Sequence, residues 1–547
     1  MVLFERNLTA LGRTDSRLAE RLRKTAAATN TVALKSTGGL IVPARRVAGR
    51  ERPFHSTVDP LREGTRTRRL YPGGGYFVFL GLGGGYQTGG FLDDSTGEVQ
   101  RLVIIERDPA FLRAVMSLLD LSKLFSDSRV RLLAGESPEQ IRLFLTRDYL
   151  PIRDGALRTI PLRSSVDADP EYFAAVTQTC REAVGILAAD AAVQARFGRR
   201  WFLNTLANLE TAGGAASHLP RATKAIVLAA GPSLESRLPE LPALRRRGWY
   251  VIATDTSLPL LQGANLFPNL VLSLDCQHIS YHHFLRGLPP DVPLALDLAS
   301  PPLLSRLARR KFFFSGGHPF SRYLASLWRR FPLVDTSGGN VTQAAVSLAR
   351  LLGAEEILVF GADFSYPAGK PYARGTYLYP YYRSRETRCR PLESLFFSFL
   401  RRGGPLMRSA GGYTTAVMDA YRQNLETAVE SWAGNQSRNA EGDLRIRLPA
   451  GSDSIPAGGM PDQPQLQPLA WRDFLADYAA ALAALPSPQN PLRIYLEGLS
   501  PGQHDLWMTQ LPAAAATARF RPGLAGATLL ESTRAWALSV ICRVLNK

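Results

Sequence analysis

The sequence has few cysteines. Four occur in 547 residues, at Cys180, Cys276, Cys389 and Cys542, and no two of them form a C-x-x-C pair. A disulfide framework or a structural zinc site needs cysteines at close, repeated spacing. The sequence therefore predicts free thiols in a reducing compartment and no bound metal.

Long hydrophobic runs are also missing. No apolar stretch reaches the roughly 18 residues that a membrane-spanning helix needs. The first 28 residues mix acidic, basic and apolar side chains and contain no apolar core of a secretory signal. We therefore expect no membrane span, no signal peptide and a cytoplasmic location.

Acidic residues are outnumbered by basic ones. The chain has 65 Lys and Arg against 47 Asp and Glu, a formal net charge of +18. Such an excess suits an anionic partner, namely a nucleotide, a nucleic acid or an acidic lipid surface, although genome base composition can also enrich arginine. Because the basic residues are dispersed and no nucleic-acid motif accompanies them, nucleic acid is not a predicted partner.

The pattern along the chain predicts an α/β protein with five regions. An N-terminal helix and an extended segment occupy 1–70, and a Rossmann-like accessory domain occupies 71–204. A nucleotide-binding domain is predicted at 205–440, because apolar strands alternate there with helices. A loop rich in Gly, Pro, Ser and Asp follows at 441–465, and an Ala- and Leu-rich helical region at 466–547.

The first Rossmann-like domain opens with an apolar strand at 76–80. A glycine-rich turn at 81–85 follows it, and a second strand ends in Glu106. A helix is predicted at 110–119 and a third strand at 130–133. This order is typical of a Rossmann-like fold, and it also resembles the start of a methyltransferase, so binding of S-adenosylmethionine or a nucleotide is one alternative for this domain.

The central region repeats the alternation of strands and helices. It predicts a mostly parallel sheet with both faces covered, and such sheets bind ligands at the carboxyl ends of their strands. The predicted strands are 225–229, 250–254, 270–274, 294–296, 312–314 and 357–360, and a helix is predicted at 343–352.

A turn of small residues follows the first central strand. Gly231 permits a sharp change of direction, Pro232 sets φ for a first helical turn, and Ser233 is suited to cap a helix. The free N–H groups of such a helix start attract phosphate. An ordinary strand-to-helix turn needs the same residues, and this alternative stays open.

Acidic residues end the next two strands. Asp255 follows Thr254, and Asp275 follows Leu274. At a carboxyl edge, Asp255 is expected to face the crevice in which ligands bind, and Asp275 is a candidate for contact with a ribose hydroxyl, a metal ion or an acceptor group. A helix N-cap is the simpler alternative for Asp275.

A second polar turn, 337–340, precedes the helix at 343–352. Bare glycine backbone in such a turn can lie against a planar or phosphate group. The candidate ligand-binding residues of this turn are Ser337, Gly338, Gly339 and Asn340.

The last central strand ends in Gly361-Ala362-Asp363-Phe364. Tyrosines and basic residues crowd the segment that follows, and such groups are suited to a phosphate leaving group. A surface loop with aromatic packing is the alternative. The crowded residues are Tyr366, Tyr372, Tyr377, Tyr379, Tyr381 and Tyr382, with Lys370, Arg374, Arg383, Arg385 and Arg388.

The order and spacing of these motifs resemble the MptE-like domain family. That family includes the Maf (motility-associated factor) flagellin glycosyltransferases and an archaeal 6-hydroxymethyl-dihydropterin diphosphokinase. The resemblance covers nearly the whole chain and is strongest in 225–376. It rests on Gly231-Pro232-Ser233-Leu234, Leu274-Asp275, Gly338-Gly339-Asn340-Val341 and Gly361-Ala362-Asp363-Phe364, and nearer the N-terminus on Glu5-Arg6-Asn7-Leu8, His55-Ser56-Thr57-Val58-Asp59-Pro60, Glu63, Gly81-Leu82-Gly83 and Ile105-Glu106-Arg107-Asp108-Pro109.

The family in turn resembles bacterial sialyltransferases that use CMP-sugars. The resemblance implies that Tyr366 and Tyr372 contact the phosphate of the nucleotide. It implies that the cytidine is contacted by Gly231, Pro232, Ser233, Ser337 and Gly338, and our full set of candidate binding residues adds Asp255, Asp275, Gly339, Asn340 and Gly361 to these.

The catalytic base is where this chain departs from that pattern. The sialyltransferases use a downstream histidine, whereas no histidine lies here between His318 and His504. We assign Asp363 and Tyr372 as the candidate catalytic residues, with Glu386 or Glu393 as alternative carboxylates.

The resemblance implies a glycosyltransferase that moves a sialic-acid-like (nonulosonic) sugar from a CMP-activated donor to Ser or Thr of flagellin, with no further cofactor. The alternative is a diphosphokinase that moves pyrophosphate from ATP to 6-hydroxymethyl-dihydropterin, with Mg²⁺ held by Asp275 or Asp363. A non-catalytic scaffold of the same fold is the third hypothesis. The identity of the sugar and the oligomeric state are not predicted.

Overall fold

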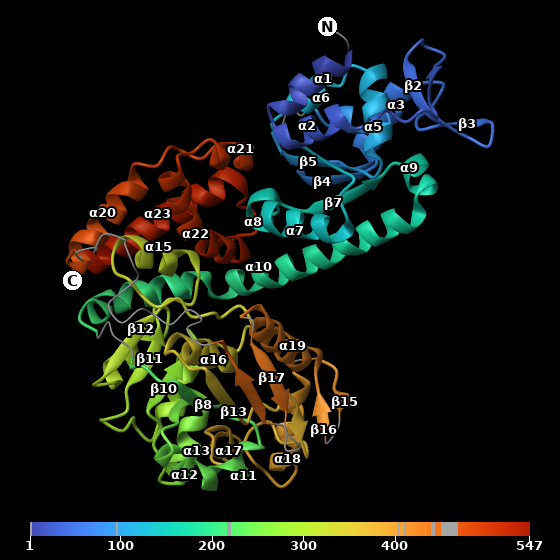
Figure 1. Ribbon diagram of the computed structural model, residues 1–547. Helices are drawn as coiled ribbons and strands as arrows, with labels where there is room; N and C mark the ends of the chain where they lie inside the picture. Colours follow the sequence, from blue (N-terminus) through green and yellow to red (C-terminus); the bar gives the residue numbers. More distant parts are fainter. Residues whose placement is uncertain are drawn as a thin grey trace. The chain divides into compact units, whose positions relative to one another are not determined.

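A computed structural model of the chain shows two compact units (Figure 1). Unit 1 comprises Met1–Gly198 and Leu485–Ala535, and unit 2 comprises Arg199–Ala484 and Trp536–Lys547. Each unit contains a parallel sheet covered by helices, so the predicted α/β class is confirmed. The structure describes residues 3–93, 97–215, 220–402, 404–409, 412–432, 434–438, 443–449 and 469–546.

The N-terminal segment, expected to be one amphipathic helix, forms two. Helix α1 spans Leu3–Gly12 and α2 spans Ser16–Lys24. The Asp15 side chain accepts the backbone N–H of Leu18 at 2.8 Å, and this cap starts the second helix in a new direction. The apolar spacing nevertheless marks the buried faces, since Leu8, Leu11, Leu18 and Leu22 are all buried.

A three-stranded antiparallel sheet follows these helices. Its strands are β1 (Thr31–Lys35), β2 (Ile41–Val47) and β3 (Arg50–Pro53), in the order β1-β2-β3. The sequence indicates only an extended stretch here. Neither β1 nor β3 has a buried residue, and β3 consists of charged residues and a proline, so no apolar pattern marks the sheet.

Unit 1 is built on a four-stranded sheet of order β6-β5-β4-β7, in which every pair is parallel. All residues of β4 (Gly75–Leu80) and β5 (Val99–Glu106) are buried, which explains why their apolar runs were recognisable. Strand β6 spans Val130–Ala134. Strand β7 (Leu157–Pro161) was not predicted, because its residues are only half-buried and it has no continuous apolar run.

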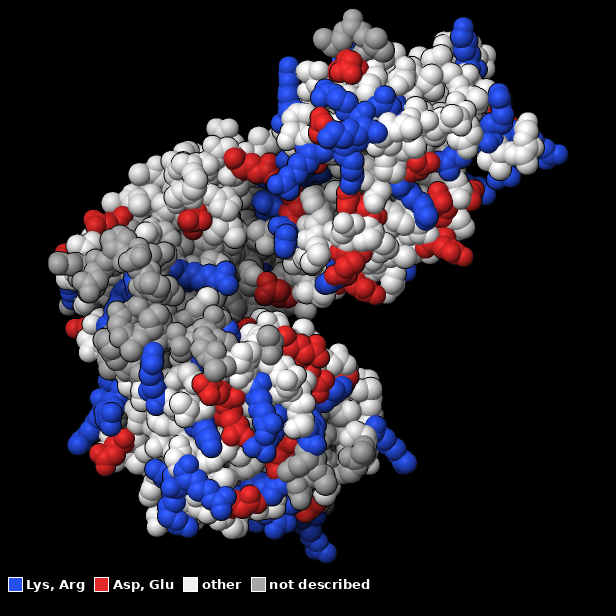
Figure 2. All heavy atoms as spheres, in the orientation of Figure 1, with Lys and Arg blue, Asp and Glu red and all other residues white. Residues whose placement is uncertain are grey.

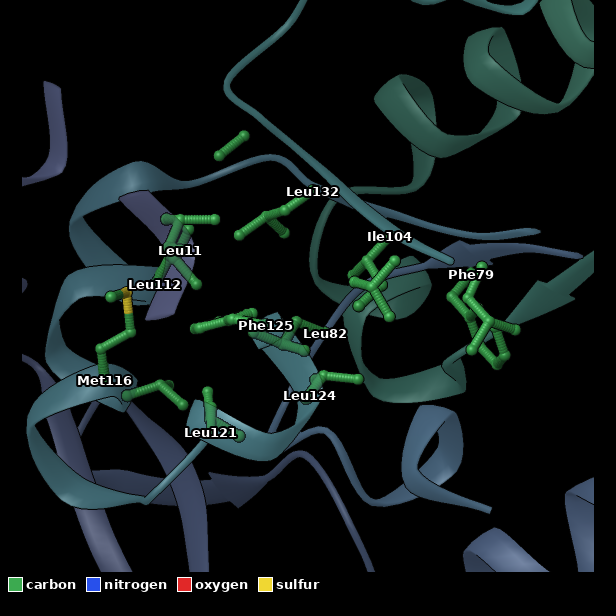
Figure 3. Close-up of a cluster of buried hydrophobic side chains, with 14 of the residues drawn as sticks. Leu11, Phe79, Leu82, Ile104, Leu112, Met116, Leu121, Leu124, Phe125 and Leu132 are labelled. Carbon is green, nitrogen blue, oxygen red and sulfur yellow. The ribbon is translucent and has the colours of Figure 1, made fainter. Parts of the chain in front are cut away.

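One face of this sheet packs on the N-terminal helices. Figure 3 shows Phe79 and Ile104 of the strands in one hydrophobic cluster with Leu11 of α1 and Phe125 of α6. The helices of the unit before α10 are α3 (Pro60–Leu70), α4 (Tyr86–Gly89), α5 (Pro109–Leu118), α6 (Ser122–Ser126), α7 (Pro138–Asp148), α8 (Pro151–Asp154) and α9 (Arg163–Ala168).

Unit 2 is built on an eight-stranded sheet of order β12-β11-β10-β9-β8-β13-β18-β17. The first six strands are parallel and the last two run antiparallel to their neighbours. Each predicted strand of the central region lies in this sheet. The strands are β8 (Lys224–Leu228), β9 (Tyr250–Thr254), β10 (Leu270–Ser273), β11 (Leu294–Asp297), β12 (Lys311–Phe314), β13 (Glu356–Phe360), β17 (Asn435–Arg438) and β18 (Leu444–Arg447).

The helices and the small sheet of unit 2 cover this sheet and its edges. The predicted helix at 343–352 is α16 (Val341–Leu351), which contacts β8, β9, β10 and β13. The remaining α-helices are α11 (Leu234–Arg237), α12 (Leu241–Arg246), α13 (Leu258–Gly263), α14 (Pro302–Leu307), α15 (Pro319–Leu327), α17 (Leu378–Arg383), α18 (Leu392–Arg401), α19 (Ala416–Ser431) and α20 (Trp471–Ala483). Short 3-10 helices span Leu238–Glu240, Asp255–Ser257 and His278–Phe284. The small sheet consists of β14 (Tyr366–Pro367), β16 (Gly412–Thr414) and β15 (Met407–Ser409), in that order.

The boundaries of the units differ from the expected regions. The proposed boundary after residue 204 falls inside α10 (Pro170–Gly213), a 44-residue helix that contributes to both units. The described part of the region 466–547 is mainly helical, and it too is divided between the units. Helices α21 (Leu492–Glu497) and α22 (Pro501–Phe520) belong to unit 1, α20 belongs to unit 2, and the boundary at residue 535 falls inside α23 (Gly526–Leu545). Within the expected loop 441–465, residues 444–447 form β18, and 450–465 lie outside the described residues.

Basic side chains are spread over the surface. Figure 2 shows Lys and Arg across the visible face, with Asp and Glu between them, as the dispersed sequence pattern predicts. Among the described residues, no helix combines the length and the apolarity needed to cross a membrane.

A buried ion network attaches the C-terminal helix α21 to the sheet of unit 1. Arg493 is 1% exposed and donates to Asp154 at 2.7 and 2.9 Å and to Asp148 at 3.0 Å. Arg101 of β5 also pairs with Asp148, which accepts the Tyr76 hydroxyl at 2.8 Å. The network thus joins residues that are far apart in the sequence. Removing one of its charges would leave the opposite charge buried without its partner, which is unfavourable.

Replacing Arg493 with methionine should destabilise unit 1. The variant removes the guanidinium and leaves the fully buried Asp154 side chain with fewer partners, a change that typically costs about 3–5 kcal/mol. Urea unfolding followed by circular dichroism measures the loss. The control is Arg163→Met, whose side chain is 94% exposed and should have no measurable effect. Equal stability of the two variants would contradict the assigned role of the network.

The pH dependence of stability should report on Glu106. Burial raises the pKa of Glu106 from 4.5 to about 7, so the folded state keeps its proton over a range in which the unfolded state loses it. Glu106 therefore reduces the free energy of unfolding as the pH rises from about 4.5 to 7, by up to about 3 kcal/mol. Thermal unfolding should show a smaller loss between pH 5 and pH 8 in Glu106→Gln than in the native chain or in the exposed Glu171→Gln. Parallel profiles would contradict this assignment.

Candidate functional site

The strands β8 and β13 lie side by side at the point where the strand order of unit 2 reverses. From β8 the chain continues to β9 on one side, whereas β13 lies on the other side. In open parallel sheets, ligands bind at such a switch point, beyond the carboxyl ends of the strands. We call the carboxyl ends of β8 to β13 the carboxyl edge of unit 2.

The loops that leave β8 and β13 pack directly on each other. Gly231 donates its backbone N–H to the carbonyl of Gly361 at 2.9 Å. A Cβ at Gly231 would lie 2.4 Å from that carbonyl oxygen, and Gly361 has a φ of +72°. Side chains at these positions would separate the loops, which gives the two predicted glycines a physical reason.

Asp363 joins the same two loops through its side chain. Its Oδ2 accepts the backbone N–H of Ser233 at 3.0 Å. Burial raises the pKa of Asp363, and the hydrogen bonds from Ser233 act against this. The carboxylate therefore holds the turn that contains Pro232, and its role as a catalytic base stays a prediction.

Asp255 is buried at the end of β9. Its Oδ2 accepts the Ser273 hydroxyl at 2.6 Å, and its Oδ1 accepts the backbone N–H of Thr256 at 2.7 Å. Asp275 lies one strand further out, where its Oδ1 accepts the N–H of Gln277 at 2.9 Å. Burial raises the pKa of Asp275, and the nearby charge of Asp255 adds to that effect.

The turn before α16 is held tightly by its own side chains. Asn340 caps the helix, because its Oδ1 accepts the N–H of Gln343 at 2.9 Å. The Ser337 N–H donates to Asp335 at 2.9 Å, and a Cβ at Gly338 would collide with the Gln343 side chain. Gly339 has a φ of +69° and faces the Tyr421 ring. The predicted residues of this turn thus serve its geometry.

The predicted tyrosines meet near Asp255. Burial is the main cause that raises the pKa of Tyr372 to about 12; Arg402 acts in the opposite direction, and Tyr366, Asp255 and Tyr421 add smaller increases. Tyr366 is buried on β14. At neutral pH, Tyr372 therefore keeps its proton and is a hydrogen-bond donor.

The structure adds residues that the sequence reasoning missed. Tyr421 of α19 and Arg402 at the end of α18 interact with Tyr372, although neither is near a recognised motif. His283 packs on Tyr377 with ring centroids 4.7 Å apart, and its Nε2 lies 3.4 Å from the Thr256 hydroxyl. Burial lowers the pKa of His283. Three histidines in the segment 278–283, directly after Asp275, were the available signal.

Other predicted candidates lie on the surface. Glu386 is exposed and accepts the N–H of Leu392 at 3.1 Å, and Glu393 is exposed at the start of α18. Both are thus carboxylates of an outer segment. The Arg374 N–H binds Glu235 at 2.8 Å, and Arg385 lies over the Tyr381 ring.

Three buried polar atoms in this part of unit 2 have no hydrogen-bond partner among the described residues. They are Oε1 of Gln343, Nδ1 of His283 and Oγ1 of Thr376. Unpaired buried polar groups are rare and each needs an explanation, of which a bound polar ligand is one. In contrast, a cavity of about 550 Å³ lies at the amino end of β12. Its lining includes Arg309, Arg310 and Lys311, and no motif residue takes part.

The glycine turn of unit 1 is already engaged by the chain itself. Gly84 donates its N–H to His55 Nε2 at 2.8 Å, and Leu82 donates to Glu106 at 3.2 Å. A Cβ at Gly83 would lie 2.5 Å from His55 Nε2, and Glu63 lies 3.3 Å from the other ring nitrogen. Two backbone N–H donors of this turn are thus already hydrogen-bonded within the chain and are not free to bind a nucleotide.

The described residues contain no group of three or more His, Cys, Asp and Glu side chains that could hold a metal ion. Asp275 and Asp363 follow β10 and β13, which are three strand spacings apart, or about 14 Å. They are therefore too far apart to bind one ion together.

Residues 202–369 match the family described as 6-hydroxymethylpterin diphosphokinase MptE-like. Two uncharacterized proteins of Treponema pallidum (strain Nichols) are related in sequence. One is 36% identical over 151 residues, which are 26% of this chain and 54% of that protein. The other is 30% identical over 168 residues, which are 30% of this chain and 80% of that protein. The chain thus spans about half the length of the first relative and four-fifths of the second.

A solved structure, that of the Maf glycosyltransferase from Magnetospirillum magneticum AMB-1, is similar along nearly the whole chain. The TM-score is 0.50, and the likeness covers 99% of this chain and 90% of that one. At 14% sequence identity, it shows the fold alone. Residues 202–369 therefore form an MptE-like domain, and the chain has the fold of a Maf glycosyltransferase.

Proposed function

We propose that the chain is a glycosyltransferase that takes a sialic-acid-like (nonulosonic) sugar from a CMP-activated donor. The observation that carries the proposal is the direct packing of the loops after β8 and β13, with Asp255 and Tyr372 close to each other at the same carboxyl edge. The full-length likeness to a Maf glycosyltransferase supports the reaction class. A cytoplasmic site of action stays a prediction from the sequence.

The tyrosines would serve the leaving group. When the sugar leaves CMP, negative charge grows on the phosphate oxygen, and a neutral hydroxyl donor stabilises it. Tyr372 remains protonated at neutral pH, and Arg402 supplies a positive charge in the same part of the site. Ser233 is bound to Asp363 through both its N–H and its hydroxyl, so it would contribute by holding the turn in place beside the donor.

The acceptor would be a serine or threonine hydroxyl of a protein, with flagellin as the proposed case. A flagellin acceptor follows from the resemblance to flagellin-modifying Maf proteins. The net charge of +18 is compatible with an anionic donor.

A diphosphokinase is the second candidate, because the matching family is described by that activity. It would use ATP with Mg²⁺, held by Asp275 or Asp363. Each of these carboxylates already accepts a backbone N–H, which uses part of its capacity to bind an ion. A non-catalytic scaffold is the third candidate, and the unpaired polar atoms of Gln343, His283 and Thr376 favour a bound ligand instead.

Thermal unfolding with nucleotides tests the proposal. CMP at 100 times its dissociation constant should stabilise unit 2 by roughly 2.7 kcal/mol, and it should do so without metal. Tyr372→Phe should weaken CMP binding by about 10- to 100-fold, because it removes a hydrogen bond to a charged phosphate. Ser337→Ala should weaken it as well.

The matched control is Tyr413→Phe, which changes an exposed tyrosine of the same unit and should bind CMP as the native chain does. If ATP with Mg²⁺ stabilises the chain and CMP does not, the diphosphokinase hypothesis replaces the glycosyltransferase hypothesis. If CMP, CDP, ATP with Mg²⁺ and S-adenosylmethionine all leave the unfolding temperature unchanged, the result favours the non-catalytic scaffold.

A further inference from the structure

A second pair of titratable groups lies on the carboxyl edge of unit 2. Asp297 is the last residue of β11, and His318 is the N-cap residue of α15. His318 Nε2 lies 3.1 Å from Asp297 Oδ1. No recognised motif contains either residue, and 21 positions of sequence separate them.

The structure fixes Asp297 firmly. Its side chain is 2% exposed and accepts the backbone N–H groups of Ala299 at 2.7 Å and Gly316 at 2.6 Å. A Cβ at Gly316 would lie 2.4 Å from Oδ2, so only glycine allows this approach. The two backbone donors hold the carboxylate in one orientation, facing the imidazole.

This arrangement sets the tautomer of His318. With Nε2–H donated to the carboxylate, Nδ1 is the basic nitrogen. The ring stacks on the indole of Trp201 with centroids 5.1 Å apart and an interplanar angle of 7°. The side chain is 15% exposed, so the basic nitrogen is held in one orientation but is not sealed in the core.

The pair is connected to the proposed donor site. The Thr336 hydroxyl donates to the carbonyl of Gly316 at 2.5 Å, and Thr336 directly precedes Ser337 in the turn before α16. Gly316 thus binds Asp297 through its N–H and the donor turn through its carbonyl. Three other carboxylates of the edge accept hydrogen bonds but face no histidine at this distance: Asp255 accepts from Ser273, Asp275 from Gln277 and Asp363 from Ser233.

We propose that His318 is the general base of the transfer and that Asp297 is its positioning residue. Nδ1 takes the proton of the acceptor hydroxyl while the acceptor oxygen forms a bond to the anomeric carbon of the sugar. The bond from that carbon to the phosphate oxygen breaks, and CMP leaves with the electron pair. When water replaces the acceptor, the same step hydrolyses the donor. This inference rests on the proposed function.

Release of CMP from CMP-N-acetylneuraminate by the full-length chain measures the step, and CMP binding is measured on the same samples. His318→Ala should lower kcat by about 100-fold or more, with KM for the donor and CMP binding nearly unchanged. Added imidazole should restore part of kcat in His318→Ala, because the Trp201 face provides a platform for the ring. Asp297→Asn should also lower kcat without changing KM.

The control is His504→Ala, which removes an exposed histidine 3.9 Å from Asp505 in unit 1 and should keep full activity. If the native chain releases CMP and His318→Ala keeps the native kcat, or gains nothing from imidazole, the base assignment is wrong while the glycosyltransferase stands. If the native chain neither binds CMP nor releases it from the donor, both the proposed function and the base assignment are wrong.

Discussion

The close approach of the loops after β8 and β13 is the constraint on which the candidate site depends. These two strands are neighbours in the sheet, yet their chains leave in opposite directions. Gly231 and Gly361 let the backbones touch, and Asp363 then reaches the Ser233 N–H. Because this contact fixes the two central loops, the outer ones, which carry Asp255 and the Tyr372 segment, are arranged around a rigid centre. The Ala373 N–H, for example, donates to the Ala230 carbonyl at 2.9 Å.

The two units use similar parallel sheets, and in both the chain itself binds the turn that follows the first strand. In unit 1, His55 and Glu106 take N–H groups of the glycine turn after β4. In unit 2, Gly361 and Asp363 take the N–H groups of Gly231 and Ser233 after β8. Buried polar atoms without a hydrogen-bond partner among the described residues occur in both units, for example Ser165 Oγ in unit 1 and Gln343 Oε1 in unit 2. The order of strand, turn and helix alone therefore does not distinguish a structural turn from a binding site.

The sequence predicts the buried strands well, because each is a continuous apolar run bounded by polar turns. The strands β7, β17 and β18 escape it, since their residues are half-buried or alternate without a clear run. The glycine turns and tyrosines of the site are recognisable from local spacing. His318 and Asp297 are not, because only the parallel pairing of β11 and β12 brings them within hydrogen-bonding distance. Tyr421 and Arg402 are missed for the same reason, since each comes from a separate helix.

The course of the chain has a consequence for how the protein can be divided. It enters unit 2 at Arg199, returns to unit 1 at Leu485 and enters unit 2 again at Trp536. Three covalent crossings therefore join the units, so a single cut by a protease, or a truncation at one point, releases neither of them intact. A terminal deletion would remove Arg493 from the ion network of unit 1 long before it reached the sheet of unit 2. Neither unit is therefore encoded as one uninterrupted segment of the chain.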